Sequence, residues 1–335
     1  MISTALIGLG RIAYELEKDS KREKPCTHLG TYLNFPESFL LVGAFDLDPL
    51  KRDAFASAFP AIPLFDSLES LLSSRPQLLS IATPAGSHLS LIKAICASPH
   101  KPRLIWLEKP VAPDFKTAKK IHHLCREAGI AVLVNHERRY DPHYRQVKEI
   151  IAQKSLGSLK SIHAQMYTSA HPDLPAGSGT LLEDGTHLVD MLLFLTAQKP
   201  SSYQTFVQKR PGNNVETRLY GILQFPDFPV FIDSGGDRKY FHFALEINFS
   251  RGHISIGNGF YNVFSAQSSP YYEKFQSLLP SPDFPPPVSK NMFINLGEEI
   301  VLFFKGDKTL TSSLHDSLSV MEIIDRLYKK SRLLA

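Results

Sequence analysis

The feature that most constrains this chain is a glycine turn directly behind an apolar strand near its beginning. The apolar run Ser3–Ile7 is followed at once by Gly8-Leu9-Gly10-Arg11-Ile12-Ala13. The glycines permit a tight turn and a close approach of the backbone to a diphosphate, whose charge a following helix N-terminus favours. A tight strand–helix turn without a ligand is the alternative. Because the turn heads an alternating series of strands and helices, we expect it to bind a dinucleotide.

The first 137 residues alternate short apolar runs with amphipathic segments. Fully apolar strands separated by helices predict a parallel sheet that is covered on both faces, which is a doubly wound α/β fold. The expected strands are Ser3–Ile7, Leu40–Phe45, Leu78–Ala82, Leu104–Leu107 and Ala131–Val134, and the expected helices are Pro49–Ala58, Ser67–Ser73, Ser87–Ala97 and Asp114–Ala128.

The pattern changes after about Arg138, where consecutive strands follow one another without helices between them. Since 335 residues exceed what one core usually organises, we expect two domains, 1–137 and an α+β domain over 138–335 with a mostly antiparallel sheet. Ser265–Val288 is rich in Pro and Ser and is expected to be irregular. The expected helices are Pro142–Gln153, Thr186–Thr196, Lys290–Lys305 and Ser312–Ser331, and the expected strands are Leu159–Thr168, Tyr203–Lys209, Thr217–Phe225, Val230–Ser234, Phe241–Ser250 and His253–Ile256.

The composition argues against several classes of protein. Lys+Arg 37 against Asp+Glu 33 leaves a net charge of +4, which is too small to indicate a nucleic-acid partner. The three cysteines have no CxxC spacing and indicate neither a disulfide framework nor a zinc site. No apolar stretch reaches the roughly 20 residues that span a membrane, and the N-terminus lacks the pattern of a signal peptide. We therefore expect a cytoplasmic protein with no membrane partner.

Asp46 follows the second expected strand and is the candidate carboxylate for the adenosine ribose. A carboxylate there accepts hydrogen bonds from the ribose hydroxyls and repels a 2′-phosphate, which favours NAD over NADP, although NADP stays possible. The alternative is helix capping, for which Asp48 before Pro49 is the better candidate. Asp46 lies 38 residues after Gly8 (46 − 8), against the usual ~20. The excess indicates an insertion over Glu15–Thr27, which is either a surface loop or a cover for the cofactor.

A lysine stands at the end of the fourth expected strand, in Glu108-Lys109-Pro110. The carboxyl ends of parallel strands face the ligand crevice of such a sheet. An ammonium group there can hydrogen-bond a substrate oxygen and stabilise developing negative charge. A polar turn without a catalytic role is the alternative for the tripeptide alone.

The segment from Glu183 to Asp190 brings carboxylates close to an imidazole. Glu183 and His187 are four residues apart, so on a helical backbone they share a face, and a carboxylate beside an imidazole tunes it as a general base. One alternative is that Asp184 or Thr186 caps the following helix. A metal site is the other, but HExxH and a clustered third ligand are both missing from the sequence, so we expect no metal.

With these three segments in order, the chain resembles the Gfo/Idh/MocA oxidoreductase family over nearly its whole length. Two further segments carry the resemblance, Ala82-Thr83-Pro84-x-x-x-His88 and Asn135-His136-Glu137-Arg138-Arg139-Tyr140-Asp141-Pro142. The resemblance implies an N-terminal Rossmann domain and a C-terminal domain whose large open sheet mediates a homo-oligomer, a dimer or a tetramer. It implies that Lys109 and His187 are catalytic and that Glu183, where many members carry aspartate, assists His187. It places Ala82, Thr83, Pro84, His88 and Glu108 around the cofactor.

These observations lead us to expect an NAD-dependent oxidoreductase that acts on a carbinol or ketone of a sugar-like or cyclitol substrate. The cofactor contacts are expected from Gly8, Leu9, Gly10, Arg11, Ile12, Asp46, Ala82, Thr83, Pro84, His88, Glu108 and Lys109. Candidates for substrate recognition are Arg138, Arg139, Tyr140 and Asp184, with junction salt bridges as the alternative for the first three. Other open alternatives are a non-catalytic cofactor-binding regulator on the same fold and a dihydrodiol or biliverdin-type reductase.

Overall fold

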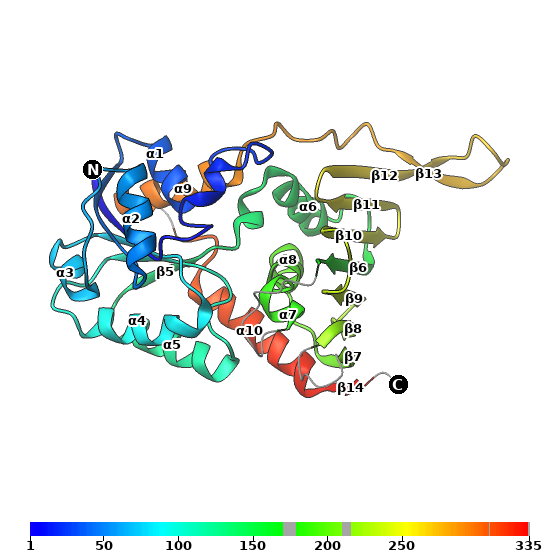
Figure 1. Ribbon diagram of the computed structural model, residues 1–335. Coiled ribbons are helices and arrows are strands. Elements are labelled where there is room, and N and C mark those ends of the chain that lie inside the picture. The colour runs from blue at the N-terminus through cyan, green and yellow to red at the C-terminus, as the bar shows by residue number, and fades with distance from the viewer. Residues whose placement is uncertain (170–178, 210–215, 308, 334–335) are drawn as a thin grey trace. The chain divides into compact units, whose positions relative to one another are not determined.

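The computed structural model describes residues 1–169, 179–209, 216–307 and 309–333, and it divides into two compact units (Figure 1). The first unit comprises Met1–Tyr140 and Lys290–Met321, and the second comprises Asp141–Ser289 and Glu322–Ala335. The units therefore do not follow a single division at residue 137, because residues 290–321 return to the first unit. The fold class is confirmed as α/β, with a parallel sheet in one unit and a mostly antiparallel sheet in the other.

The first unit is built on a five-stranded parallel sheet in the order β2-β1-β3-β4-β5. Its strands are mostly apolar, and apart from part of the edge strand β2 they are almost wholly buried because helices cover both faces. The order reverses direction between β1 and β3, and in such sheets the ligand crevice lies at the carboxyl ends beside that point. The strands are β1 (Ile2–Ile7), β2 (Phe39–Phe45), β3 (Leu78–Ile81), β4 (Leu104–Leu107) and β5 (Ala131–Val134).

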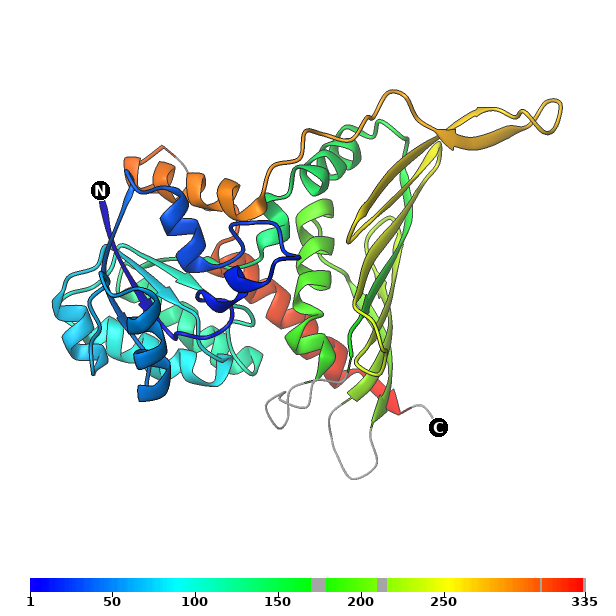
Figure 2. The ribbon, with the colours of Figure 1, turned by 45° about the horizontal axis from the view of Figure 1, so that its top comes forward.

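Several helices of the first unit begin at a side-chain cap. Asp48 accepts a hydrogen bond from Leu50 N–H and stands before Pro49, so it is the cap that the sequence indicated. Figure 2 shows α1 and α9 together on one face of the sheet and α4 and α5 on the other. The helices are η1 (Glu15–Lys18), α1 (His28–Asn34), α2 (Pro49–Ala58), α3 (Leu68–Ser73), α4 (Ala85–Ala97), α5 (Phe115–Glu127), η2 (Glu137–Tyr140) and α9 (Met292–Lys305).

The expected insertion interrupts the helix that starts after the glycine turn and continues as α1. His28 N–H donates to the carbonyl of Ile12 at 3.1 Å, and Leu29 N–H donates to that of Ala13 at 2.9 Å. A helical bond normally joins residues four apart, whereas these join residues 16 apart (28 − 12 and 29 − 13), so twelve extra residues leave the helix and return to it. Without them Asp46 would follow Gly8 by 26 residues (38 − 12), close to the usual ~20.

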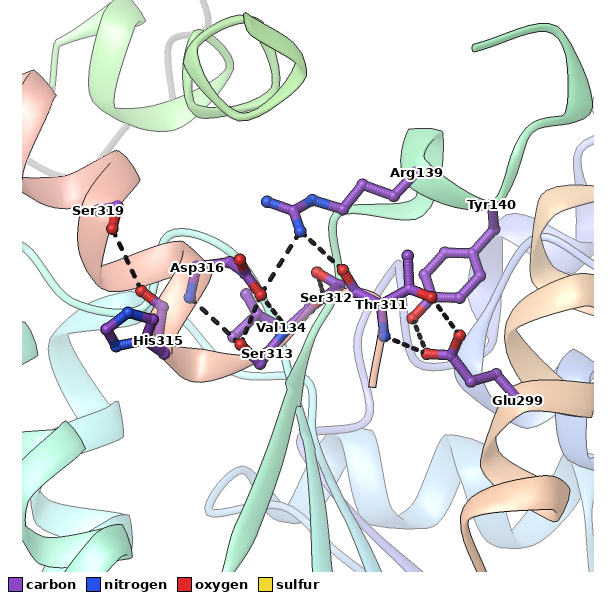
Figure 3. A network of polar contacts seen from close by, with 10 residues as sticks. All are labelled: Val134, Arg139, Tyr140, Glu299, Thr311, Ser312, Ser313, His315, Asp316 and Ser319. Atoms are coloured by element: carbon purple, nitrogen blue, oxygen red, sulfur yellow. Dashed lines mark hydrogen bonds and ion pairs between the residues drawn. The ribbon is translucent and has the colours of Figure 1, made fainter. Parts of the chain in front are cut away.

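Residues 290–321 join the first unit through polar contacts with the end of β5 and with the segment that follows it (Figure 3). Ser312 and Val134 exchange hydrogen bonds, in which Val134 N–H donates to the Ser312 carbonyl at 2.9 Å and the Ser312 hydroxyl donates to the Val134 carbonyl at 2.7 Å. α9 packs against α1 and η2. The predicted division at residue 137 places these residues in the second domain instead. Sequence order alone does not show against which sheet a later helix packs.

The second unit contains a nine-stranded sheet in the order β13-β12-β11-β10-β6-β9-β8-β7-β14. Neighbouring strands are antiparallel except for the pairs β6·β9 and β7·β14. Figure 2 shows α6 and α8 along one face of this sheet. The elements are α6 (Pro142–Gln153), β6 (Leu159–Tyr167), α7 (Thr180–Glu183), α8 (Thr186–Thr196), β7 (Ser202–Lys209), β8 (Glu216–Gln224), β9 (Pro229–Gly235), β10 (His242–Phe249), β11 (Gly252–Gly257), β12 (Phe260–Ser268), β13 (Gln276–Pro280) and β14 (Ser331–Leu333), while α10 (Leu314–Lys329) contains the boundary between the units.

The prediction that Ser265–Val288 is irregular is wrong for its first part. β12 extends to Ser268 and pairs with β13 in a hairpin, with Phe264 opposite Pro280. Proline is tolerated there because β13 is the edge strand and needs no hydrogen bond on its outer side. Residues 281–289 have no regular secondary structure, as the composition indicated.

Candidate active site

The glycine turn lies where the carboxyl ends of three strands meet. Gly8 has a φ of +87°, and a Cβ on it would lie 2.6 Å from the carbonyl oxygen of Ala82, which follows β3. Gly8 N–H also donates to the Phe45 carbonyl at the end of β2, at 2.9 Å. Glycine is therefore required here by the backbone itself, because β1, β2 and β3 converge on it.

Gly10 is open where Gly8 is crowded. Among the described residues, the nearest atom to a Cβ on Gly10 would be the Lys51 Nζ at 3.9 Å. Leu9 N–H donates to Asp46 Oδ2 at 2.7 Å, and Asp48 N–H donates to Asp46 Oδ1 at 2.9 Å. Each carboxylate oxygen thus accepts one bond and retains acceptor capacity for a ribose hydroxyl. An open glycine backbone beside a carboxylate fits the diphosphate and ribose of a dinucleotide.

The other predicted residues of the turn begin the interrupted helix. Arg11 is exposed and Ile12 is half-buried. Their carbonyls accept bonds from Leu16 N–H at 3.0 Å and His28 N–H at 3.1 Å, respectively. The turn is thus attached to both ends of the insertion.

The segment after β3 is tied to the segment after β4 by a buried histidine. Pro84 precedes α4, and Thr83 shares a hydrogen bond with Ser87 at 2.7 Å between their hydroxyls. His88 on α4 is fully buried, with Nε2 2.8 Å from the Thr83 carbonyl and Nδ1 3.0 Å from the Val111 carbonyl. Burial lowers the pKa of His88 although both carbonyls favour the charged ring. His88 lies between the two segments, and a neutral ring donates to only one of these two carbonyls.

Glu108 is the buried polar centre of the first unit. Its N–H donates to the Ile81 carbonyl at 3.0 Å, which extends the pairing of β4 with β3. Its Oε1 accepts from Asn135 Nδ2 at 2.5 Å and lies 2.9 Å from His28 Nε2. Burial alone would raise the pKa of Glu108, but the hydrogen bond and charge of His28, followed by the charge of Lys109, lower it overall. Glu108 is therefore an ionised carboxylate beside Lys109, which is half-buried.

Sequence reasoning missed His28 and Asn135 as partners of Glu108. Asn135 follows β5, so its place at a strand end was the available signal. His28 begins α1 after the insertion and reaches Glu108 only through the fold, since 80 residues separate them. Nothing in the local sequence distinguished it from the other histidines.

The second predicted constellation lies in the second unit at a break between two helices. α7 ends at Glu183 and α8 begins at Thr186, with His187 N–H donating to the Asp184 carbonyl at 3.2 Å. The backbone therefore stays nearly helical from Glu183 to His187. Gly185 occupies the cap position of α8 without a side-chain hydrogen bond, so neither Asp184 nor Thr186 is that cap. His187, Glu183 and Asp184 are all half-buried.

α7 is capped by side chains from distant parts of the second unit. Leu181 N–H donates to Glu216 Oε1 at 3.1 Å, and Leu182 N–H donates to the Tyr328 hydroxyl at 3.2 Å. That hydroxyl in turn donates to Glu216 Oε1 at 2.7 Å. A Cβ on Gly179 would lie 1.7 Å from Glu216 Oε2, so only glycine leaves room for this carboxylate. These residues hold the helix that leads into Glu183, and no local sequence pattern indicates them.

Two of the candidates for substrate recognition are buried in the first unit (Figure 3). The Arg139 guanidinium donates to the Thr311 carbonyl at 2.7 Å and lies 3.6 Å from Asp316 Oδ2. Tyr140 is fully buried, and its hydroxyl donates to Glu299 Oε1 at 2.7 Å. The ion pair of Arg139 is the kind of contact that the sequence left open as an alternative, and the role of both residues in substrate recognition stays a prediction. Arg138 is half-buried on η2.

Lys109 belongs to the first unit and His187 to the second, so their convergence stays a prediction. Within the described ranges, the structure shows no group of three His, Cys, Asp or Glu side chains that could hold a metal ion. None of the helices in those ranges is long and apolar enough to cross a membrane.

Comparison with known families agrees with this arrangement. A family model described as the oxidoreductase family with an NAD-binding Rossmann fold matches residues 2–136, and the GFO/IDH/MocA C-terminal domain matches residues 144–255. The chain belongs to the Gfo/Idh/MocA family. The protein is therefore an oxidoreductase whose first unit carries an NAD-binding Rossmann domain, as the glycine turn and the alternating strands predicted.

Relatives of this Gfo/Idh/MocA protein include an inositol 2-dehydrogenase. It is 27% identical over 274 residues to an inositol 2-dehydrogenase of Arthrobacter sp., covering 76% of this chain and 74% of that protein. Its fold is similar to that of the WlbA dehydrogenase of Bordetella pertussis in complex with NADH and UDP-GlcNAcA (TM-score 0.77, 18% identity, 98% and 96% covered). It is also similar to that of a super-repressor mutant of Gal80p from Saccharomyces cerevisiae (TM-score 0.78, 17% identity, 98% and 95% covered). At such identities a structural likeness shows the fold alone.

Proposed function

We propose that this protein is an NAD-dependent dehydrogenase that transfers a hydride to or from a carbinol or ketone carbon of a sugar-like or cyclitol substrate. The observation that carries the proposal is the meeting of the open Gly10 backbone, the Asp46 carboxylate and the Glu108-Lys109 segment at one edge of a parallel sheet. That edge is where open α/β sheets bind ligands. The inositol 2-dehydrogenase relative supports the substrate class.

The residues proposed to form the cofactor site are Gly8, Leu9, Gly10, Arg11, Ile12, Asp46, Ala82, Thr83, Pro84, His88, Glu108 and Lys109. Because His88 and Glu108 are already bonded within the first unit, we assign them to shaping the site. Asp46 is assigned to the ribose hydroxyls, so NADH is expected to quench the fluorescence of Trp106, the only tryptophan, more effectively than NADPH does. Equal quenching by the two cofactors would contradict this assignment.

A nicotinamide cofactor held by these residues would supply the hydride acceptor for oxidation and the hydride donor for reduction. Lys109 hydrogen-bonds the reacting oxygen and stabilises negative charge on it. His187 takes the hydroxyl proton during oxidation and returns it during reduction, and Glu183 orients the imidazole. We assign Arg138 and Asp184 to substrate recognition, and Arg139 and Tyr140 to holding Arg138 in place.

The test is the formation or consumption of NADH over a panel of cyclitols, sugars and nucleotide sugars. Lys109→Ala and His187→Ala are expected to lose turnover, whereas the exposed controls Lys116→Ala and His123→Ala retain it. Full activity in both active-site variants would refute the mechanism. Binding of NADH without turnover of any substrate would instead support the non-catalytic regulator.

We also propose that the sheet of the second unit forms a homodimer or a tetramer. Phe206, Ile222 and Phe231 are 36%, 38% and 36% exposed, their neighbours along each strand are buried, and Ile222 pairs directly with Phe231. Large apolar side chains that cluster on an exposed face mark an interface. Light scattering is expected to show an oligomer for the wild type and a smaller species for Phe231→Glu, and a monomeric wild type would refute the proposal.

A further inference from the structure

The twelve-residue insertion is an ordered segment tied to the start of α1. Its Glu17 Oε1 accepts from Cys26 N–H at 2.7 Å and from the Thr27 hydroxyl at 2.8 Å. Lys24 Nζ donates to the carbonyls of Leu16 and Asp19 at 2.8 and 2.7 Å. The insertion is therefore held closed by its own hydrogen bonds, and Glu17 joins its first residues to its last ones.

Glu17 also lies against the backbone of α1. A Cβ on Gly30 would fall 2.0 Å from Glu17 Oε1, so glycine at this position leaves room for the carboxylate. Thr27, which donates to Glu17, accepts from Gly30 N–H at 3.0 Å and so caps α1. One carboxylate thus fixes the cap and the first turn of this helix.

The first residue of that helix, His28, is fully buried and reaches the candidate active site. Its Nε2 lies 2.9 Å from Glu108 Oε1, and its Nδ1 lies 2.9 Å from the Ser80 hydroxyl, which is also bonded to the hydroxyl of Tyr32. The imidazole stacks on Trp106, with ring centroids 3.7 Å apart and planes at 24°. Both ring nitrogens and one ring face are therefore engaged, which leaves the imidazole a single orientation.

We propose that the insertion is a clamp that fixes His28 and, through His28, the carboxylate of Glu108 next to Lys109. Glu17 and His28 are then positioning residues, because neither needs to touch the substrate. The clamp explains why twelve residues interrupt the helix at this point and why a glycine stands at position 30. Its catalytic consequence rests on the proposed function of Lys109.

The clearest perturbation is Gly30→Ala, which leaves Glu17 and His28 unchanged. Alanine favours a helix over glycine by about 1 kcal/mol, so by propensity alone this variant is stabilised. Its Cβ displaces the end of the flexible Glu17 side chain and so opens the clamp. Glu17→Ala opens it by deletion, and Glu23→Ala, in an exposed part of the same insertion, is the matched control. His28→Leu removes the bond to Glu108, whereas His28→Gln retains an N–H donor.

Two measurements on the full chain test the proposal. In steady-state kinetics, Gly30→Ala, Glu17→Ala and His28→Leu are expected to lower kcat by roughly tenfold to a hundredfold with little change in substrate KM, and His28→Gln recovers part of the loss. Emission from Trp106, which reports its stacking with His28 without any substrate, changes in the first three variants and is unaltered in Glu23→Ala.

The outcomes separate this proposal from the one on which it rests. Wild-type kcat and Trp106 emission in both Gly30→Ala and His28→Leu, together with an inactive Lys109→Ala, would overturn the clamp and leave the proposed function standing. An active Lys109→Ala would overturn the proposed function, while altered Trp106 emission in Gly30→Ala would still support the clamp. Thermal denaturation checks that each variant is folded before its kinetics are compared.

Discussion

Replacing Gly10 with alanine separates a turn that binds a dinucleotide from one that only connects a strand to a helix. A Cβ there would meet no described atom closer than 3.9 Å. Alanine at an unstrained glycine position stabilises a protein by about 0.4–1 kcal/mol, so Gly10→Ala is expected to unfold at an equal or higher temperature. Gly8→Ala is the contrasting variant, because its Cβ would lie 2.6 Å from a backbone oxygen at a φ of +87°. Backbone strain alone is expected to lower the free energy of unfolding of Gly8→Ala by about 1–2 kcal/mol.

The same alanine at position 10 should weaken cofactor binding. A Cβ that holds the diphosphate away from the turn removes one charge-assisted hydrogen bond, which contributes about 1.5–3 kcal/mol. Since 1.4 kcal/mol is tenfold in affinity, the Kd for NADH is expected to rise by roughly tenfold to a hundredfold. Quenching of Trp106 and calorimetry measure the Kd, and thermal denaturation measures stability. A Gly10→Ala protein that binds NADH as tightly as the wild type would refute this reasoning.

Three further predictions concern buried groups. The pKa of Glu108 is lowered in the folded protein, so its ionised form stabilises the fold above the ordinary glutamate pKa of about 4.3, and this stabilisation is lost as the pH falls below that value. In that acid range, the free energy of unfolding should therefore depend less steeply on pH for Glu108→Gln than for the wild type. Burial raises the pKa of the Cys125 thiol to about 12, so alkylation at neutral pH should be slow until denaturant is added, and fast labelling of the native protein would contradict its burial. Tyr328→Phe removes a donor to Glu216 and should lower the free energy of unfolding by about 1–3 kcal/mol, whereas the exposed control Tyr271→Phe should not; equal stability of the two variants would rule out the cap on α7.

The sequence was most informative where local pattern and tertiary structure agree. The bounds predicted for Leu104–Leu107, Ala131–Val134 and Thr186–Thr196 match β4, β5 and α8, because buried strands and an apolar helix carry their own periodicity. The hairpin of β12 and β13 was missed since its prolines and serines indicate a loop, although an edge strand tolerates both.

The residues of the candidate site that lie at strand ends were predictable from the sequence. The residues that hydrogen-bond to them and hold them in place were not. Position at a strand end indicated Asp46 and Lys109 as candidates, because the carboxyl ends of parallel strands meet at one edge, whereas the resemblance to the family indicated Glu108. The partners that fix them come from far along the chain, as the 80 residues between His28 and Glu108 show. Such contacts depend on how helices pack on the sheet, which no local pattern records. The insertion was inferred from the spacing of Gly8 and Asp46, but its role needed the contacts of Glu17.

The most direct test of the account is transfer of deuterium from carbon-bound deuterated cyclitols and sugars to NAD, followed by mass spectrometry of the cofactor. Deuterated NADH is expected with at least one such substrate in the wild type, and none is expected with Lys109→Ala or His187→Ala. Deuterium transfer that persists undiminished in both variants would contradict it.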